Sequence, residues 1–122
     1  MATILVVDDD VNSRLLVAAL LEPAGHVVLQ AGGAEEALAR ARERHVDLVL
    51  TDLSMPGISG TALVRSLRSD PQHAATRVVL YTGSVPHGAM RDFMAIYAIR
   101  DVVVKPIDPR AFVQTIESAL SS

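Results

Sequence analysis

The sequence contains no cysteine and no tryptophan. Without cysteine, disulfide bonds and thiolate chemistry are excluded, and a reducing compartment is compatible with the chain. Two phenylalanines and two tyrosines are its only large aromatic residues, so aliphatic side chains must fill the core. No apolar run reaches the roughly 18 residues that a membrane span needs, and the N-terminus lacks the basic and apolar regions of a signal peptide. We therefore expect a cytoplasmic protein without a membrane partner.

A strong excess of one charge is also absent. Eleven Lys and Arg residues face 14 Asp and Glu residues, which gives a net charge of −3. This balance argues against a protein that binds nucleic acid directly. The 122 residues suit one domain, and 50% of them are hydrophobic, which is enough for a core. Because repeats, low-complexity tracts and linkers are lacking too, we expect a single domain.

Short apolar runs alternate with segments of helical periodicity along the chain. The pattern predicts strands at about 3–7, 26–30, 47–51, 77–81 and 101–104, with helices at 11–22, 34–44, 61–68, a segment ending near 97, and 109–120. Since a helix precedes each of the last four strands, we expect an α/β fold with a parallel sheet covered on both faces. Five strands joined by right-handed crossovers favour the flavodoxin-like order 2-1-3-4-5.

Side chains with carboxylate, hydroxyl or ammonium groups stand at the ends of four predicted strands. They are Asp8, Asp9 and Asp10 after the first, Asp52 after the third, Thr82 after the fourth and Lys105 after the fifth. Parallel strands end at one edge of the sheet, and the order 2-1-3-4-5 opens a crevice there between strands one and three. Such groups, brought together, can bind a divalent cation and handle a phosphoryl group.

The acidic residues also have a plainer interpretation. An Asp before a helix can cap free backbone amides and suits the positive end of the helix dipole, and this role is open for any single Asp at 8–10. Three consecutive acids facing Asp52 are harder to explain as caps, because two carboxylates about 4 Å apart repel by roughly 4 kcal/mol at an effective dielectric of about 20. A cation would relieve this repulsion. Oxygen ligands alone favour Mg²⁺, with Mn²⁺ or Ca²⁺ as alternatives.

Asp52, Thr82 and Lys105 each have an ordinary structural interpretation when taken singly, but together they indicate phosphoryl chemistry. Asp52 and Thr82 alone could serve in turns, and Lys105 alone could be a solvated lysine. As a set they supply a carboxylate that can become an acyl phosphate and donors for phosphoryl oxygens.

Four stretches resemble the receiver domain of response regulators in two-component signal transduction, in particular the stand-alone, chemotaxis-regulator-like type. They are ILVVDDD at 4–10, DLVLTDLSMPGISG at 47–60, VVLYTG at 78–83 and VVVKPI at 102–107. Each stretch is a weak signal by itself, but four in this order and spacing are strong. The resemblance implies a single receiver domain over residues 1–122 with no output domain.

The resemblance also implies a ligand set for Mg²⁺. Asp52 would be the phosphoacceptor and a direct metal ligand. Asp9 and the main-chain carbonyl of Ser54 would also bind the metal directly, whereas Asp8 would act mainly through water.

The remaining implied roles concern the phosphoryl group and its readout. The Thr82 hydroxyl, the Gly83 amide and the Lys105 ammonium would contact the phosphoryl oxygens, and the peptide bond before Pro106 would be cis. Receivers usually carry Tyr or Phe three residues before the lysine, whereas this chain has Val102. We therefore expect a readout through the 84–88 loop and the following helix, with Tyr81 and Tyr97 as weaker aromatic substitutes.

The leading hypothesis is a phosphorylation-controlled signalling module rather than an enzyme. It would take a phosphoryl group from a histidine kinase or phosphotransfer protein onto Asp52, promote its own phosphorylation and dephosphorylation, and signal by protein contact or phosphorelay. Helix 11–22 is apolar on more than one face and would offer a docking surface. One alternative is a small magnesium-dependent phosphatase that uses Asp8 and Asp10 as an Asp-x-Asp pair, although 122 residues leave little room for a substrate cap. Another is a pseudo-receiver that binds partners without phosphorylation.

Overall fold

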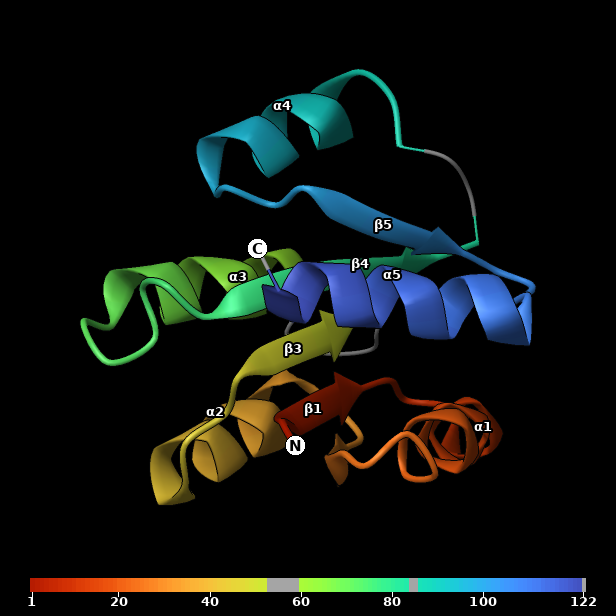
Figure 1. The fold of residues 1–122 in the computed structure, drawn as a ribbon. Coiled ribbons are helices and arrows are strands. Elements are labelled where there is room, and N and C mark those ends of the chain that lie inside the picture. The colour runs from red at the N-terminus through yellow and green to blue at the C-terminus, as the bar shows by residue number, and fades with distance from the viewer. Residues whose placement is uncertain (53–59, 84–85, 122) are drawn as a thin grey trace.

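Five parallel strands form the centre of the molecule, in the order β2-β1-β3-β4-β5 (Figure 1). The computed structural model describes residues 1–52, 60–83 and 86–121. The strands are β1 (Thr3–Val7), β2 (Val27–Ala31), β3 (Leu48–Thr51), β4 (Arg77–Thr82) and β5 (Asp101–Val104). The helices are α1 (Val11–Leu21), α2 (Ala34–Glu43), α3 (Gly60–Ser69), α4 (Ala89–Ile96) and α5 (Pro109–Ser121). The expected fold class and strand order are confirmed.

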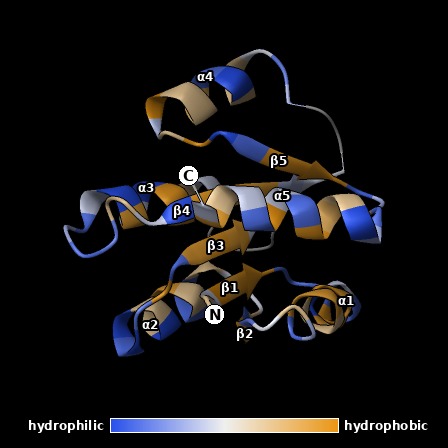
Figure 2. Ribbon diagram, in the orientation of Figure 1, coloured by the Kyte–Doolittle hydropathy of each residue, from blue (hydrophilic) through white to orange (hydrophobic). Residues whose placement is uncertain are grey.

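Helices cover both faces of the sheet, and the strands are mainly apolar, with polar residues at some strand ends such as the start of β5 (Figure 2). In β1, Leu5 and Val7 join a buried cluster with residues of α2, α3 and α4, whereas Ile4 and Val6 join a second cluster with residues of α1 and α5. Each fully buried Leu or Ile contributes roughly 1.5–3 kcal/mol. These two clusters fix the strand register and thereby the positions of the loops that follow the strands.

Helix α1 carries apolar residues on more than one face. Val17, Ala18 and Leu21 are buried, whereas Leu15 and Leu16 are 54% and 49% exposed. The expectation that part of this helix lies outside the core is therefore confirmed. Among the described segments, no helix combines the length and the apolar character that crossing a membrane requires.

Strand β3 begins one residue later than the sequence pattern predicts, and Asp47, just before it, makes two bonds to the start of β1. The Asp47 amide donates to the Thr3 carbonyl oxygen at 2.8 Å, and its carboxylate accepts from the Thr3 amide at 2.8 Å. The bond from Thr3 is the main cause that lowers the pKa of Asp47, with burial acting against it and His45 adding to it.

This carboxylate should make stability depend on pH. A carboxyl group whose pKa is lowered in the folded state stabilises the fold above its ordinary pKa of 3.8, and the contribution is lost as the pH falls through the folded-state value. We expect Asp47→Asn to melt below wild type near neutral pH, and the difference to narrow in acid. Thermal melts of both proteins from neutral to acidic pH test this prediction, with Glu43→Gln as the control for net charge. A difference that does not vary with pH would contradict the assignment.

Candidate functional site

The carboxyl ends of four strands bring the predicted site residues to one edge of the sheet. Backbone hydrogen bonds continue the ladder just past the strand ends. The amide of Asp8 donates to the Ala31 carbonyl at 3.1 Å, that of Asp52 to the Val7 carbonyl at 3.0 Å, and that of Lys105 to the Thr82 carbonyl at 2.7 Å. The pairing of the strands therefore fixes the backbone positions of Asp8, Asp52 and Lys105, from which their side chains extend.

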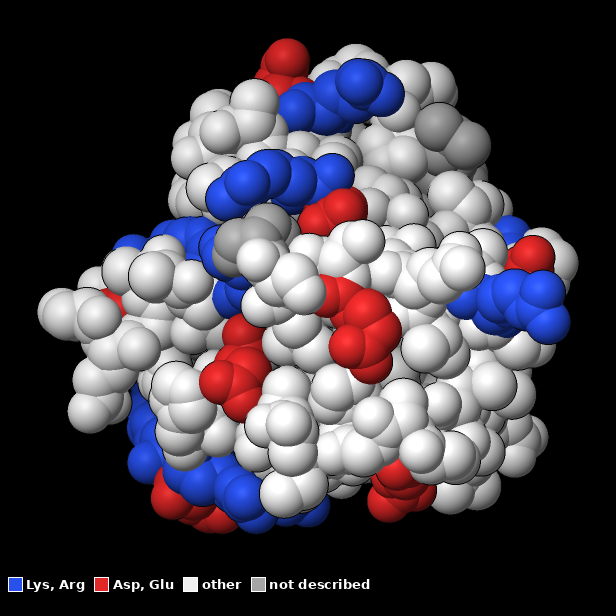
Figure 3. Space-filling model, in the orientation of Figure 1, with Lys and Arg blue, Asp and Glu red and all other residues white. Residues whose placement is uncertain are grey.

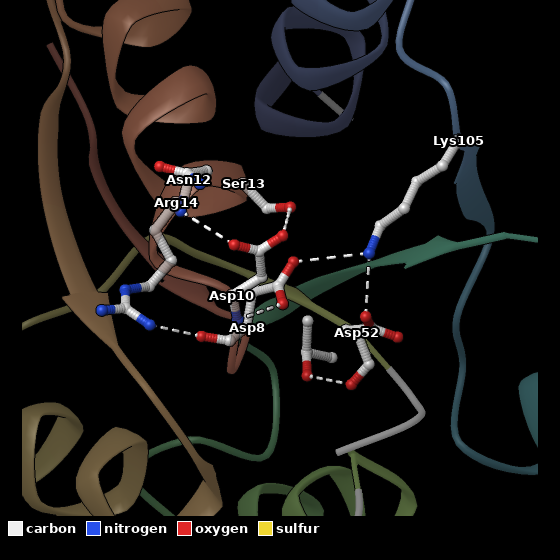
Figure 4. A network of polar contacts seen from close by, with 8 residues as sticks. Asp8, Asp10, Asn12, Ser13, Arg14, Asp52 and Lys105 are labelled. Atoms are coloured by element: carbon white, nitrogen blue, oxygen red, sulfur yellow. Dashed lines mark hydrogen bonds and ion pairs between the residues drawn. The ribbon is translucent and has the colours of Figure 1, made fainter.

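The Lys105 ammonium lies between two carboxylates (Figure 4). Its Nζ is 2.9 Å from Oδ2 of Asp52 and 3.4 Å from Oδ2 of Asp8. The Asp8 side chain is only 1% exposed, and those of Asp52 and Lys105 are 13% and 29% exposed. Because water screens these charges less than charges on an open surface, the attraction is stronger than in an ordinary surface ion pair.

Burial and neighbouring charges have opposing effects on the pKa values of Asp8 and Lys105. Burial raises the pKa of Asp8; the bond from the Asp10 amide and the Lys105 charge oppose this rise, and the Asp52 charge adds to it. Burial would lower the pKa of Lys105, but its hydrogen bond to Asp52 and the charges of both carboxylates outweigh burial and raise it. Lys105 is therefore a fixed positive charge at the acidic site.

Three carboxylates form a cluster that suits a hard cation. Oxygens of Asp8, Asp9 and Asp52 all lie within 4.8 Å of one another. When all three are ionised, the Lys105 ammonium leaves two formal negative charges uncompensated. Oxygen-only donors and a divalent deficit fit Mg²⁺, which takes a few carboxylates and keeps several waters. Ser54, the predicted carbonyl ligand, lies outside the described residues.

Asp10 has the helix-capping role that the sequence left open for each of the three acids. It is the N-cap of α1, and its carboxylate accepts from the Asn12 amide at 2.9 Å and from the Ser13 hydroxyl at 3.2 Å. These bonds turn the Asp10 carboxylate toward the helix. An Asp-x-Asp phosphatase site would need Asp8 and Asp10 to act together on substrate, so this arrangement disfavours that alternative.

Thr82 and Gly83 lie at the end of β4, next to the strand that leads to Lys105. Thr82 ends β4 opposite Val104 of β5 and is partly buried, whereas Gly83 is exposed. A Cβ placed on Gly83 would meet no atom within 4 Å, so the backbone there borders open space. The Lys105–Pro106 peptide bond is cis, which confirms the expectation drawn from the resemblance.

Sequence reasoning missed the contacts that two residues make at this edge: Arg14 was not singled out, and Tyr81 was named only as a weaker aromatic substitute in the readout. Arg14 reaches back from α1, and its Nη1 donates to the Asp8 carbonyl oxygen at 2.7 Å. The ring of Tyr81 lies under Lys105, with Nζ 4.1 Å from the ring centroid. Neither contact follows from a sequence motif. The approach of Tyr81 could have been anticipated only from its place before Thr82, on the strand next to Lys105.

The fold and the site together define a class of protein. A parallel sheet of order 2-1-3-4-5, with an acidic cluster and a lysine at its carboxyl edge, is the arrangement of a receiver. The family model described as "Response regulator receiver domain" matches residues 4–117. The chain belongs to this family of phosphorylation-controlled signalling domains.

Individual relatives support the same assignment. The chain is 33% identical to Protein PilH of Pseudomonas aeruginosa over 99% of both chains. It is 34% identical to part of the CAI-1 autoinducer sensor kinase/phosphatase CqsS of Vibrio cholerae, covering 85% of this chain but 16% of that protein. Among solved structures, the chemotaxis protein CheY4 of Vibrio cholerae superposes with a TM-score of 0.91, at 28% identity and with 98% of each chain covered.

The different roles of Asp9 and Asp10 predict opposite effects on stability without metal. Asp9→Asn should raise the melting temperature, on the order of 2 °C, because it relieves repulsion in the acidic cluster. Asp10→Ala should lower stability by roughly 1 kcal/mol, because it removes the α1 cap. Melts in EDTA measure both. An Asp9→Asn protein less stable than wild type would show that Asp9 acts chiefly as a cap.

Proposed function

We propose that Asp52 accepts a phosphoryl group from a phosphohistidine of a kinase or phosphotransfer protein, in a magnesium-dependent reaction. The observation that carries this proposal is the Lys105 ammonium, held at 2.9 Å from Asp52 beside the three-carboxylate cluster. A carboxylate nucleophile, a site for a divalent cation and a fixed cation are the parts that phosphoryl transfer requires. The carboxylate cluster and lysine also argue against a pseudo-receiver.

In the proposed reaction a carboxylate oxygen of Asp52 attacks the phosphorus. The phosphorus–nitrogen bond breaks as the new phosphorus–oxygen bond forms, and the donor imidazole leaves with its electron pair and takes up a proton. Water later attacks the phosphorus, which returns the Asp52 carboxylate and releases inorganic phosphate. Lys105 would bind a phosphoryl oxygen, and the Thr82 hydroxyl and Gly83 amide would bind others by charge-assisted hydrogen bonds.

Asp8, Asp9 and Asp52 are the residues that would hold Mg²⁺, with Asp8 contributing mainly through water and Ser54 through its carbonyl. The bound ion would offset the negative charge of the phosphoryl group during transfer. The buried Asp8 carboxylate also accepts from the Asp10 amide at 2.9 Å. That bond uses one carboxylate oxygen of Asp8 and leaves the other, Oδ2, facing Lys105.

Two surfaces support protein partners for this module. The exposed Leu15 and Leu16 of α1 lie on the helix that begins just after the acidic loop, where a donor protein must approach. A second surface is a groove of about 410 Å³ between α4 and β5, lined by Met94, Ile99, Val102 and Val104 together with Arg91 and Arg100. Basic side chains stand over α4 and the start of β5 in Figure 3. We propose that the donor uses the first surface and that a downstream protein uses the second.

Phosphorylation should depend differently on the three acids. With Mg²⁺ and acetyl phosphate, intact mass spectrometry should show one phosphoryl adduct on wild type and none on Asp52→Asn. Asp9→Ala should lose Mg²⁺ binding and the adduct together, whereas Asp8→Ala should weaken both less, since its contact is through water. Asp10→Asn is the matched control and should still form the adduct.

Other results would overturn this function. Equal Mg²⁺ affinity in wild type and Asp9→Ala would refute the ligand assignment. Turnover of diverse phosphomonoesters would favour the phosphatase instead. Absence of any adduct, with acetyl phosphate and with kinases, would favour the pseudo-receiver.

Val102 predicts where phosphorylation is read out. Val is short and has few rotamers, so Val102 cannot sweep through the volume that a Tyr or Phe would. We expect amide exchange with and without beryllofluoride to change mainly at residues 83–97. A change centred on β5 around Val102, with 83–97 unaffected, would show that this prediction is wrong.

A further inference from the structure

The Lys105 ammonium has a third neighbour besides its two carboxylates. Its Nζ lies 4.1 Å from the centroid of the Tyr81 ring, well inside the roughly 6 Å range in which a cation is attracted to an aromatic face. Tyr81 is 2% exposed and belongs to the buried cluster that α1 and α5 cover. The ammonium is therefore bounded by the carboxylates of Asp52 and Asp8 and by a ring held in the core.

The far end of the ring lies near the start of α1. The Tyr81 hydroxyl is close to Ser13, whose own hydroxyl donates to the Asp10 carboxylate at 3.2 Å. Burial raises the pKa of the Tyr81 hydroxyl, so the ring stays a neutral phenol. A neutral ring held in the buried cluster is a rigid support for a flexible lysine.

Filling the core is the plainer role for Tyr81, but it does not account for this geometry. A leucine in the same place would fill much of the volume and would give the ammonium no attraction. Lys105 has a four-carbon stem with considerable rotamer freedom. Its contact with Asp8, at 3.4 Å, is longer than its contact with Asp52, at 2.9 Å. The ring adds an attraction to those of the two carboxylates.

We propose that Tyr81 is a positioning residue for phosphoryl transfer at Asp52. Its ring holds the Lys105 ammonium at the acceptor carboxylate before transfer, within reach of the phosphoryl oxygens that arrive there. This inference rests on the proposed function. In this proposal Tyr81 increases the rate of phosphoryl transfer through Lys105. The Tyr81 ring does not need to contact the phosphoryl group.

The first test compares rates of phosphorylation by acetyl phosphate. Tyr81→Leu should lower the rate constant by about 3- to 30-fold, the range that a cation–π contact supports, and Tyr81→Phe, which keeps the ring, should restore it to near wild type. In a Lys105→Ala background, Tyr81→Leu should cause no further loss, since the two residues act as one unit. An equal loss in both backgrounds would mean that the ring is merely structural.

The second test does not depend on phosphorylation or on a large-to-small substitution. Because the chain has two tyrosines and no tryptophan, Tyr97→Phe leaves Tyr81 as its only strong intrinsic fluorophore. Lys105→Met in that background should change Tyr81 emission in the metal-free protein. In proton NMR, the Lys105 ε-methylene should carry an upfield ring-current shift that Tyr81→Phe retains. Unchanged emission together with an unshifted ε-methylene would overturn the inference.

These tests separate failure of the inference from failure of the function. If wild type forms no aspartyl phosphate while the ring-current shift is present, the proposed phosphoryl transfer fails, and with it the contribution of Tyr81 to its rate. If wild type is phosphorylated and Tyr81→Leu, folded by its melting curve, reacts as fast as wild type, Tyr81 has no positioning role.

Discussion

The Lys105 ammonium between Asp52 and Asp8 is the interaction around which this structure is arranged. Carboxylates crowded at one sheet edge repel one another, and burial of Asp8 makes the repulsion more costly. One fixed cation offsets part of that charge. It comes from the far end of the chain in sequence, 97 residues from Asp8, so the sheet must be complete before the site exists. Fold and site therefore depend on each other.

The partial neutralisation has a chemical consequence. The described site keeps an excess of carboxylates over cations, so it would attract a divalent cation such as Mg²⁺. Because Lys105 adjoins Asp52, the proposed acceptor, the same site could also attract a phosphoryl group. A site whose carboxylates were all neutralised by lysines would not attract a metal cation. A site without Lys105 would repel the incoming phosphate. The balance of charges, rather than any single residue, suits the edge to phosphoryl transfer.

Much of this arrangement could be predicted from the sequence, because strand ends in a parallel sheet are constrained. The runs before Asp8, Asp52 and Lys105 indicated strands of one parallel sheet, and right-handed crossovers favoured the order 2-1-3-4-5. Which of the three acids caps α1 could not be predicted, since the capping role of Asp10 depends on its backbone dihedrals at the start of that helix. The sequence places Tyr81 on the strand next to Lys105, but the contact itself could not be predicted, because it depends on a rotamer and on how far the lysine stem extends. Val102 differs from these cases: the sequence identified the substitution, and the structure places it on the groove between α4 and β5.

The most direct test of the account is a crystal structure with Mg²⁺ and beryllofluoride. We predict beryllofluoride on a carboxylate oxygen of Asp52, the metal ligated by Asp9 and Asp52, and the Lys105 ammonium on a fluorine, still over the Tyr81 ring. Beryllofluoride bound at Asp8 or Asp9 instead, or a Lys105 ammonium that makes no contact with it, would contradict the central claim that this lysine joins the acceptor to the phosphoryl group.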